Sequence, residues 1–170
     1  MKYNDLLEIY EKLKKEYGEN AYKYISDLLK NAKIIHKRDW EKSPTPNKDH
    51  EQSWRAFKGK NLEKLILHII KDQVESLKLK VIEGNILERK RSENLSEELN
   101  KVKRNLLIHY GEFGSHLPDV DLVIYNPYDY QIIAVISTKV TLRERIAQTG
   151  YWKIKLSQDE VTKHIRVFFI

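Results

Sequence analysis

The sequence contains no cysteine. Disulfide bonds, thiolate metal sites and cysteine nucleophiles are therefore excluded, and the composition fits an intracellular protein. No apolar run approaches the roughly 20 residues that a membrane-spanning helix needs. The N-terminus also lacks the apolar segment of a signal peptide. We therefore expect a soluble, cytoplasmic protein with no membrane partner.

Several common catalytic patterns are missing too. The six histidines show no paired ligand spacing. The sequence has neither a Ser/His/Asp set nor a glycine-rich phosphate-binding loop, so no nucleotide cofactor is expected. It contains no internal repeat, which excludes a solenoid.

The size and charge of the chain narrow the remaining classes. With 170 residues and 20.3 kDa it fits one domain with a small helical appendage. Lysine and arginine number 31 against 25 acidic residues, which gives a net charge of +6. This balance favours a polyanionic partner, although lysine-rich composition is also ordinary in proteins of thermophiles.

Apolar spacing predicts two N-terminal helices within residues 3–33, with a break at Gly18-Glu19-Asn20. Residues 36–50 are polar and contain Pro44 and Pro46, which is typical of a linker or surface loop. We therefore predict a helical appendage and linker over residues 1–50, followed by a core domain over 51–170.

The core domain combines helical and strand-like periodicities. Ser96 is a candidate N-cap for one of its helices. The predicted elements are a helix over residues 51–76, a strand over 77–81, a helix over 92–107, strands over 120–125 and 131–138, a helix over 142–157 and a strand over 164–170. This order predicts an α/β fold.

Two neighbouring strands carry the residues with most chemical meaning. Asp119 and Asp121 share one strand face, and Ser137 and Lys139 share a face of the next strand. The short turn between the strands makes them antiparallel neighbours, so carboxylates and lysine converge. Such a set can hold a hard divalent cation and hydrolyse a phosphodiester. In the alternative interpretation the aspartates cap a strand after Pro118 and the lysine is solvated.

A charged triplet follows the second strand. Arg143, Glu144 and Arg145 stand in the first turn of a predicted helix, where the helix dipole disfavours arginine. Arginine can bridge guanine O6 and N7, and glutamate can accept from cytosine N4, so the triplet suits G·C pairs in a DNA major groove. Taken alone, the triplet is better explained as a solvated charged turn.

Glu63 is a further candidate on the long helix. It falls between Leu62 and Leu65, at the edge of the buried face. A carboxylate there is either a surface residue or an additional metal ligand.

These segments resemble a known family. Pro118-Asp119 followed by Ser137-Thr138-Lys139 resembles the PD-(D/E)xK nuclease motif. Lys139 followed by Arg143-Glu144-Arg145 resembles the type II restriction endonucleases that read CCGG or interrupted CC/GG sites, the group of BsaWI, NgoMIV and the EcoRII catalytic domain. The resemblance is greatest to the BsaWI type. It covers residues 53–66 and 117–157, and is absent from residues 1–50.

The resemblance implies roles for individual residues. Asp119, or alternatively Asp121, would bind Mg²⁺, and Lys139 would orient the attacking water or neutralise phosphate charge. Ser137 replaces the acidic residue that usually stands two positions before the lysine, a replacement also found in several CCGG readers, and Glu63 would compensate as a ligand.

The resemblance also bears on DNA contacts and metal affinity. Thr141 joins the arginine–glutamate triplet as a DNA-contacting residue. Some relatives have another glutamate about a dozen residues after the lysine. This chain has Trp152 and Lys153 there.

The implied fold is a restriction-endonuclease-like α/β core, a small mixed sheet flanked by helices, preceded by an N-terminal helical pair. The implied function is Mg²⁺-dependent hydrolysis of double-stranded DNA at a G·C-containing palindrome, as part of restriction-modification. A palindrome implies a homodimer. The alternatives are a repair or junction nuclease of the same fold, and a DNA-binding or assembly module with a broken nuclease site.

The last residues prompt one more expectation. Relatives usually continue beyond the apolar strand that ends in Phe168-Phe169-Ile170. We expect that strand to be buried beside the strand that ends at Lys139. The nuclease would then be either a truncated form of low activity or one that associates through the outer edge of this strand.

Overall fold

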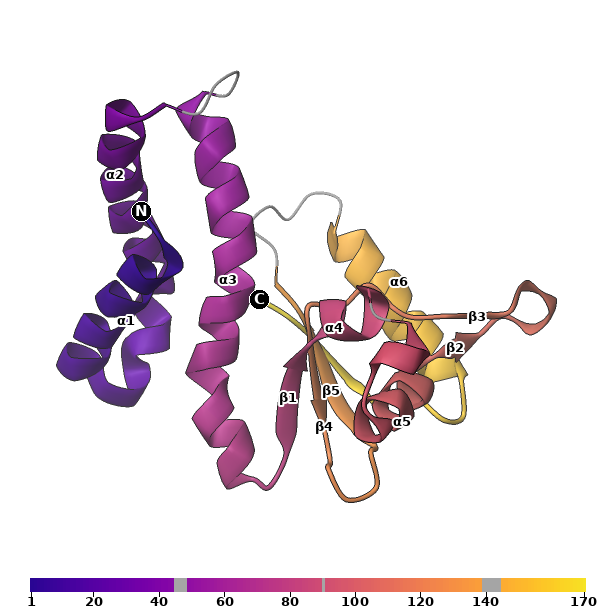
Figure 1. Cartoon of the computed structure of the whole chain (residues 1–170). Helices are drawn as coiled ribbons and strands as arrows, with labels where there is room; N and C mark the ends of the chain where they lie inside the picture. Colours follow the sequence, from indigo (N-terminus) through magenta and orange to yellow (C-terminus); the bar gives the residue numbers. More distant parts are fainter. Residues whose placement is uncertain (45–48, 90, 139–144) are drawn as a thin grey trace. The chain divides into compact units, whose positions relative to one another are not determined.

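The computed structural model describes residues 1–44, 49–89, 91–138 and 145–170 (Figure 1). It contains two compact units, Met1–Leu65 and Ile66–Ile170, and each is described by itself. Among the described residues, no helix has the length and apolar character needed to cross a membrane.

The first unit is helical. It contains α1 (Tyr3–Tyr17), the 3-10 helix η1 (Gly18–Tyr24), α2 (Ile25–Lys42) and the first part of α3 (His50–Ser76). The predicted helical pair and its break are confirmed. Gly18 adopts φ +57°, a left-handed conformation that ends α1.

Helix α2 continues further than the sequence indicated. The predicted loop over residues 36–50 is wrong for its first part, because α2 ends at Lys42. The aromatic surroundings explain the extension. The buried His36 ring lies 5.4 Å from the Trp54 ring and 5.2 Å from the Phe57 ring, and Trp40 contacts His50. These contacts stabilise the last turns of α2.

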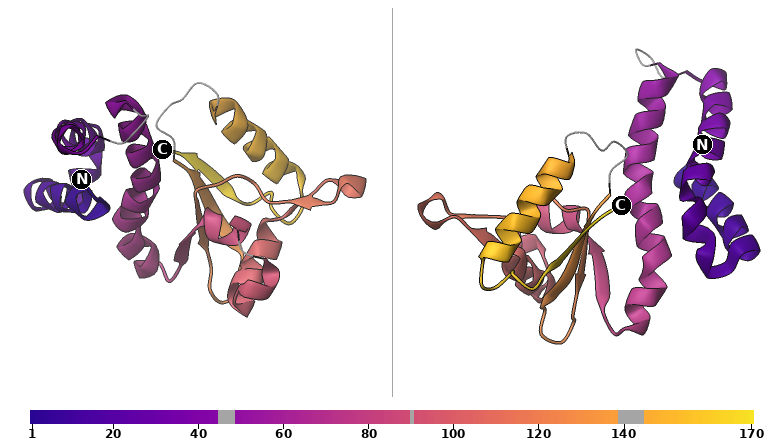
Figure 2. Two further views of the ribbon diagram at one scale, coloured as in Figure 1. Left: turned by 45° about the horizontal axis from the view of Figure 1, so that its top comes forward. Right: turned by 180° about the vertical axis from the view of Figure 1, so that it is seen from behind.

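The second unit is built on a mixed four-stranded sheet (Figures 1 and 2). Its order is β1-β4-β5-β6, antiparallel at the first two pairings and parallel between β5 and β6. The strands are β1 (Lys80–Glu83), β4 (Leu122–Tyr125), β5 (Ile132–Ser137) and β6 (Arg166–Phe169).

Helices and short elements surround this sheet. The helices are the second part of α3, α4 (Gly84–Arg89), the 3-10 helix η2 (Ser92–Asn94), α5 (Glu97–Leu106) and α6 (Arg145–Gln158). A small hairpin consists of β2 (Ile108–His109) and β3 (Ser115–His116), which are connected by the 3-10 helix η3 (Gly111–Phe113). A small mixed sheet flanked by helices, with a helical N-terminal segment, confirms the predicted fold class.

One face of the sheet packs on helices to form the core of this unit. Side chains two residues apart in a strand share a face, which places Val123, Tyr125 and Val135 together. Val102 and Leu106 of α5 and Leu156 of α6 belong to the same cluster. Burying each such side chain contributes about 1.5–3 kcal/mol, so this cluster fixes the strands that carry the candidate site.

Helix α5 is also tied to the sheet by a polar contact. The Tyr125 hydroxyl donates to Glu98 Oε1 at 2.9 Å, and Lys80 Nζ donates to the same oxygen at 2.8 Å. Burial, reinforced by Glu98, raises the pKa of Tyr125 well above its usual range. The predicted N-cap is confirmed, since Ser96 Oγ accepts from Leu99 N at 3.3 Å.

Two terminal strands differ from the predictions. The strand predicted over residues 77–81 begins later, at Lys80, because Lys78 adopts φ +60° and Leu79 N donates to Val74 O at 3.1 Å in a helix C-cap. β6 pairs with β5 as predicted, but it is not fully buried. Its residues alternate in exposure, and Phe168 is 48% exposed.

Candidate active site

The two candidate aspartates stand at the entrance to β4. The backbone N–H of Asp121 donates to Ile136 O at 3.0 Å, and the N–H of Gly84 donates to Asp121 O at 2.8 Å. The segment is therefore held from both sides, by β5 and by the junction of β1 with α4. This support fixes the backbone from which both carboxylates project.

Gly84 permits this arrangement because it has no side chain. A Cβ at this position would lie 2.0 Å from Val120 O, far closer than a non-bonded carbon and oxygen can approach. Val120 is the residue between the two aspartates. The glycine therefore lets the chain after β1 approach the aspartate segment closely.

The hairpin of β4 and β5 brings Asp121 close to the end of β5. Leu122 pairs with Ile136, and the Asp121 backbone N–H donates to the carbonyl oxygen of the same residue, Ile136, at 3.0 Å. Asp121 and Ser137, the residue that follows Ile136, are both buried, with exposed fractions of 9% and 7%. The predicted antiparallel pairing of these strands is confirmed.

A pair of hydrogen bonds holds the Asp121 carboxylate. Its Oδ2 accepts from the Thr138 backbone N–H at 2.6 Å and from the Thr138 hydroxyl at 3.3 Å. The bond from the backbone N–H is short, as strong charge-assisted bonds are, and it fixes the orientation of the carboxylate. Thr138 is a site residue that the sequence did not single out.

Asp119 has a different environment. Its side chain is exposed, and its Oδ2 accepts from the side-chain amide of Gln148 at 3.0 Å. Gln148 belongs to α6, so this bond connects the aspartate segment with the helix that follows the motif. Sequence reasoning missed Gln148, because no spacing in the chain links it to Asp119.

The structure leaves several predicted residues undetermined. Lys139, Thr141, Arg143 and Glu144 lie outside the described residues. Arg145 is the first residue of α6. Their roles stay predictions.

Glu63 lies in the first unit, on α3. Its side chain is half-buried, and it stands next to the buried Leu62. Its role as a ligand, together with Asp119 or Asp121, also stays a prediction.

The donor chemistry fits a hard cation. Among the described residues, no three histidine or acidic side chains are grouped closely enough to hold a metal ion. Mg²⁺, however, is usually bound by one or two carboxylates, with water and substrate phosphate as the other ligands. The aspartates at the entrance to β4 supply oxygen donors of the kind that Mg²⁺ prefers.

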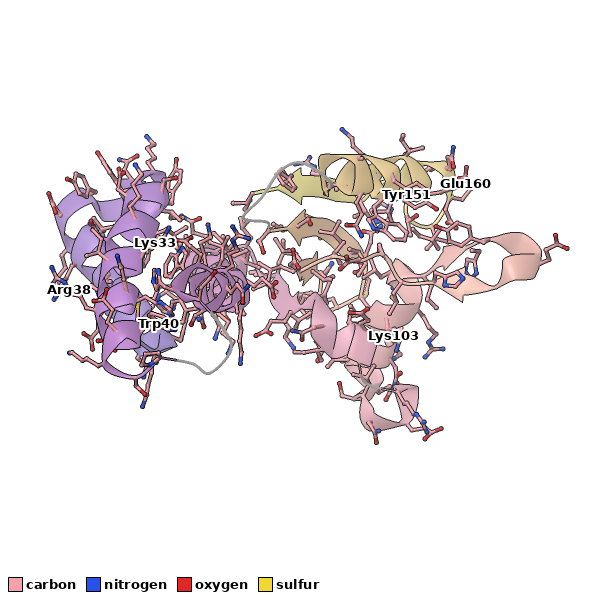
Figure 3. All side chains as sticks on the ribbon, turned by 90° about the horizontal axis from the view of Figure 1, so that it is seen from above. Lys33, Arg38, Trp40, Lys103, Tyr151 and Glu160 are labelled. Atoms are coloured by element: carbon pink, nitrogen blue, oxygen red, sulfur yellow. The ribbon has the colours of Figure 1, made fainter. Side chains whose placement is uncertain are left out.

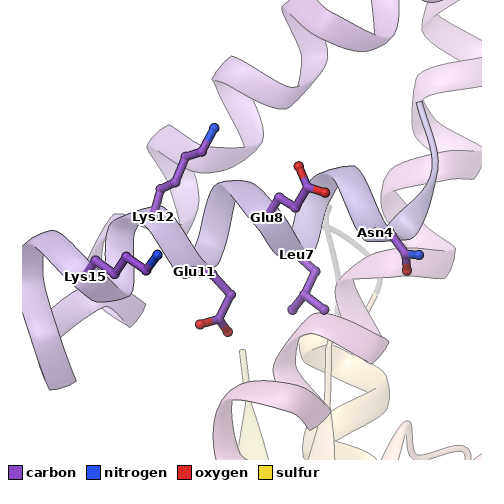
Figure 4. Close-up of a pocket in the computed structure, with 6 residues that line it drawn as sticks. All are labelled: Asn4, Leu7, Glu8, Glu11, Lys12 and Lys15. Atoms are coloured by element: carbon purple, nitrogen blue, oxygen red, sulfur yellow. The ribbon is translucent and has the colours of Figure 1, made fainter.

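A surface hollow in the first unit does not bear on this chemistry (Figure 4). Its lining consists of Asn4, Leu7, Glu8, Glu11, Lys12 and Lys15, along one side of α1. Two glutamates and two lysines line it, and none of the predicted site residues takes part.

Comparison with known proteins points in one direction. Residues 98–170 match the family described as BsaWI restriction endonuclease type 2. The chain is 38% identical over 170 residues to a protein of Methanocaldococcus jannaschii named as the type II restriction enzyme MjaVIP, an alignment that covers 99% of this chain and 69% of that protein.

A second relative is a protein of Helicobacter pylori named as the type II restriction enzyme HpyAORF263P. The chain is 43% identical to it over 119 residues, which cover 70% of this chain and 60% of that protein. No solved structure matches the chain.

Proposed function

The chain belongs to the type II restriction endonuclease family, and on this premise we propose that it cuts double-stranded DNA, with Mg²⁺ as cofactor, at a palindrome that contains G·C pairs. The observation that supports this most is the position of Asp121 beside the end of β5, where the backbone N–H and the hydroxyl of Thr138 hold its carboxylate. Because the substrate is duplex DNA, we place this activity in the cytoplasm.

We assign the main metal-binding role to Asp121 in preference to Asp119. The sequence favoured Asp119 as part of the Pro118-Asp119 pair. Asp121, however, is buried, and its carboxylate is oriented by two hydrogen bonds from Thr138. A ligand held in position before the metal arrives loses little conformational freedom on binding.

The remaining residues complete the proposed chemistry. Bound Mg²⁺ would polarise the phosphate and lower the pKa of a water. Lys139 would neutralise charge that develops on the phosphate, and Glu63 would add a carboxylate. Ser137 provides a small neutral neighbour for Asp121. The exposed Asp119, linked to Gln148, would orient groups at the rim of the site.

We assign sequence readout to residues 141–145, which lead up to and include the first residue of α6. Arg143 and Arg145 would each bridge a guanine and Glu144 would accept from a cytosine, a combination suited to a CCGG-like site. Thr141 would contact the same groove. A palindromic site requires two-fold symmetry, so we propose that the active form is a homodimer.

The isosteric variants Asp121→Asn and Asp119→Asn test the central assignment. We expect Asp121→Asn to lower plasmid cleavage at least 100-fold, because it removes the charge that holds the metal, while Asp119→Asn keeps a measurable rate at raised Mg²⁺. Cleavage should be followed across a Mg²⁺ titration, with DNA binding in Ca²⁺ as the control for folding.

Two other outcomes of this experiment would change the assignment. A larger loss in Asp119→Asn would return the ligand role to Asp119. Wild-type digestion of a plasmid into a smear, in place of discrete fragments, would favour a general nuclease of the same fold.

A further inference from the structure

A cluster of two tyrosines and a lysine joins the β2–β3 hairpin to α6. The hydroxyls of Tyr110 and Tyr151 lie 3.1 Å apart and share a hydrogen bond. Lys155 Nζ lies 5.3 Å from the centroid of the Tyr110 ring and 5.7 Å from that of Tyr151. The lysine charge is thus in reach of both ring faces. We call Tyr110, Tyr151 and Lys155 the tyrosine–lysine surface.

This surface continues the candidate site along α6. Gln148, which contacts Asp119, precedes Tyr151 by three residues, and Lys155 follows Tyr151 by four. This spacing places all three on one side of the helix. Tyr151, on α6 in Figure 3, is 45% exposed. The surface therefore begins beside an aspartate of the site and extends away from it.

The β2–β3 hairpin is connected to the site through the chain. β3 ends at His116, three residues before Asp119, and the His116 ring lies 5.5 Å from the ring of Tyr110. The exposed His109 shares a 2.6 Å hydrogen bond with Ser115. Both segments that form the surface therefore connect directly with the aspartate segment.

The charge of Lys155 is not used within the described part of the chain. The described residues give it no ion pair, whereas Lys163 in the same unit pairs with Glu160. A cation over aromatic rings gains only about 0.5–1 kcal/mol at an exposed position, so it can still bind an anion. Glu112, on η3 of the hairpin, is exposed and is the acidic residue of that element.

The tyrosine hydroxyls suit an anion as well. Burial, followed by the hydrogen bond with Tyr151, raises the pKa of Tyr110 to about 12. The hydroxyl therefore keeps its proton in neutral solution. In the linked pair, one hydroxyl donates to the other, and the second retains a hydrogen for an external acceptor.

We propose that the tyrosine–lysine surface binds the phosphate backbone of the DNA beside the phosphate that is cut, an inference that rests on the proposed function. The seven residue steps from Gln148 to Lys155 span about 10 Å of helix. Phosphates along one DNA strand advance about 3.4 Å per nucleotide along the axis. The surface therefore extends about three nucleotides from the aspartate segment, and its contacts are independent of base sequence.

The charge of Lys155 can be tested with Lys155→Gln against Lys153→Gln. Lys153 is exposed on the same helix, two residues away and thus on another side of it. The probe is a fluorescein-labelled 40-base-pair duplex of random sequence, bound in Ca²⁺ over a series of salt concentrations. We expect Lys155→Gln to weaken binding three- to tenfold at low salt. We also expect it to lower the salt slope, the slope of the logarithm of the binding constant against the logarithm of the salt concentration, by about one. Lys153→Gln should stay within about twofold of wild type.

Two further variants separate binding from a structural role. Lys155→Arg should restore the salt slope, because arginine keeps the charge and hydrogen-bond donors. Tyr151→Phe should weaken binding about two- to fivefold at an unchanged melting temperature, since it removes one hydroxyl and keeps the ring. Equal losses in Lys155→Gln and Lys153→Gln would overturn the proposal, because only the net charge would then matter.

The outcomes also distinguish this inference from the proposed function. Wild-type protein that binds the duplex but never cuts it would refute the nuclease assignment, while a slope change specific to Lys155 would still support the surface. Wild-type protein that cuts DNA, with identical salt slopes in Lys155→Gln and wild type, would refute the surface alone.

Discussion

Gly84 is the position where a single methyl group should do most damage to the site. The Cβ of alanine would lie 2.0 Å from Val120 O and 3.0 Å from Val120 C. Both are backbone atoms, so the clash cannot be relieved by a side-chain rotation. Either α4 or the aspartate segment has to move.

The size of the effect follows from two contributions. Overpacking a well-packed site costs about 1–3 kcal/mol. Displacement also weakens the 2.8 Å bond from Gly84 N to Asp121 O, worth about 0.5–1.5 kcal/mol. We therefore expect Gly84→Ala to lower the free energy of unfolding by about 2–4 kcal/mol. If the free energy of unfolding decreases by about 2 kcal/mol per molar urea, the urea concentration at the unfolding midpoint falls by about 1–2 M.

The matched control is Gly150→Ala in α6. A Cβ there meets nothing within 4 Å. Alanine is favoured over glycine within a helix by up to about 1 kcal/mol, so this variant should be as stable as wild type or more so. Urea unfolding followed by circular dichroism measures both. A Gly84→Ala variant within about 0.5 kcal/mol of wild type would refute the steric argument. A destabilised variant that cuts DNA at the wild-type rate would show that this backbone support does not matter for the site.

Two other predictions concern pH. The pKa of Tyr125 is raised above its ordinary 10.0, so the unfolded chain loses this proton first and stability should fall as pH rises above about 10. In Tyr125→Phe the free energy of unfolding should fall by up to about 1.4 kcal/mol less per pH unit in this range than in wild type. Identical pH slopes of the two proteins in chemical denaturation would exclude the effect. The pKa of His36 is lowered from 6.5, first by burial and then by His50. Its contribution to the stability of the fold is therefore complete above pH 6.5 and is lost as the pH falls below 6.5. His36→Phe should therefore show a smaller drop in melting temperature between pH 7.5 and 5.5, and an equal drop would place the pH dependence elsewhere.

The sequence predicted most of the sheet because its central strands are long and apolar. The pair of β4 and β5 and the parallel β6 follow from runs of branched residues separated by a turn or a helix. The two-residue strands of the β2–β3 hairpin were missed, since two residues carry no periodicity. The alternation at Leu77-Lys78-Leu79 predicted a strand where there is none, because those residues form the C-terminal end of a helix.

The site was predictable in its residue types but not in its connections. Side-chain alternation placed Asp119 and Asp121 on one face, yet it could not rank them. The ranking comes from the burial of Asp121 and from a bond donated by the backbone N–H of Thr138, neither of which the alternation of side chains shows. The bond from Gln148 to Asp119 spans 29 residues and depends on how α6 docks.

The mixed pairing of the sheet implies an order of assembly. β4 and β5 are joined by a tight turn, closed where Tyr130 N donates to Asn126 O at 2.8 Å, so this hairpin closes a short loop. β6 can pair with β5 only after the whole segment between Ser137 and Arg166 has been brought back along the sheet. Longer loops cost more entropy to close and form more slowly. The contact between Asp121 and Thr138 therefore belongs to an early-forming hairpin, whereas the contact of Gln148 with Asp119 waits for the later docking of α6.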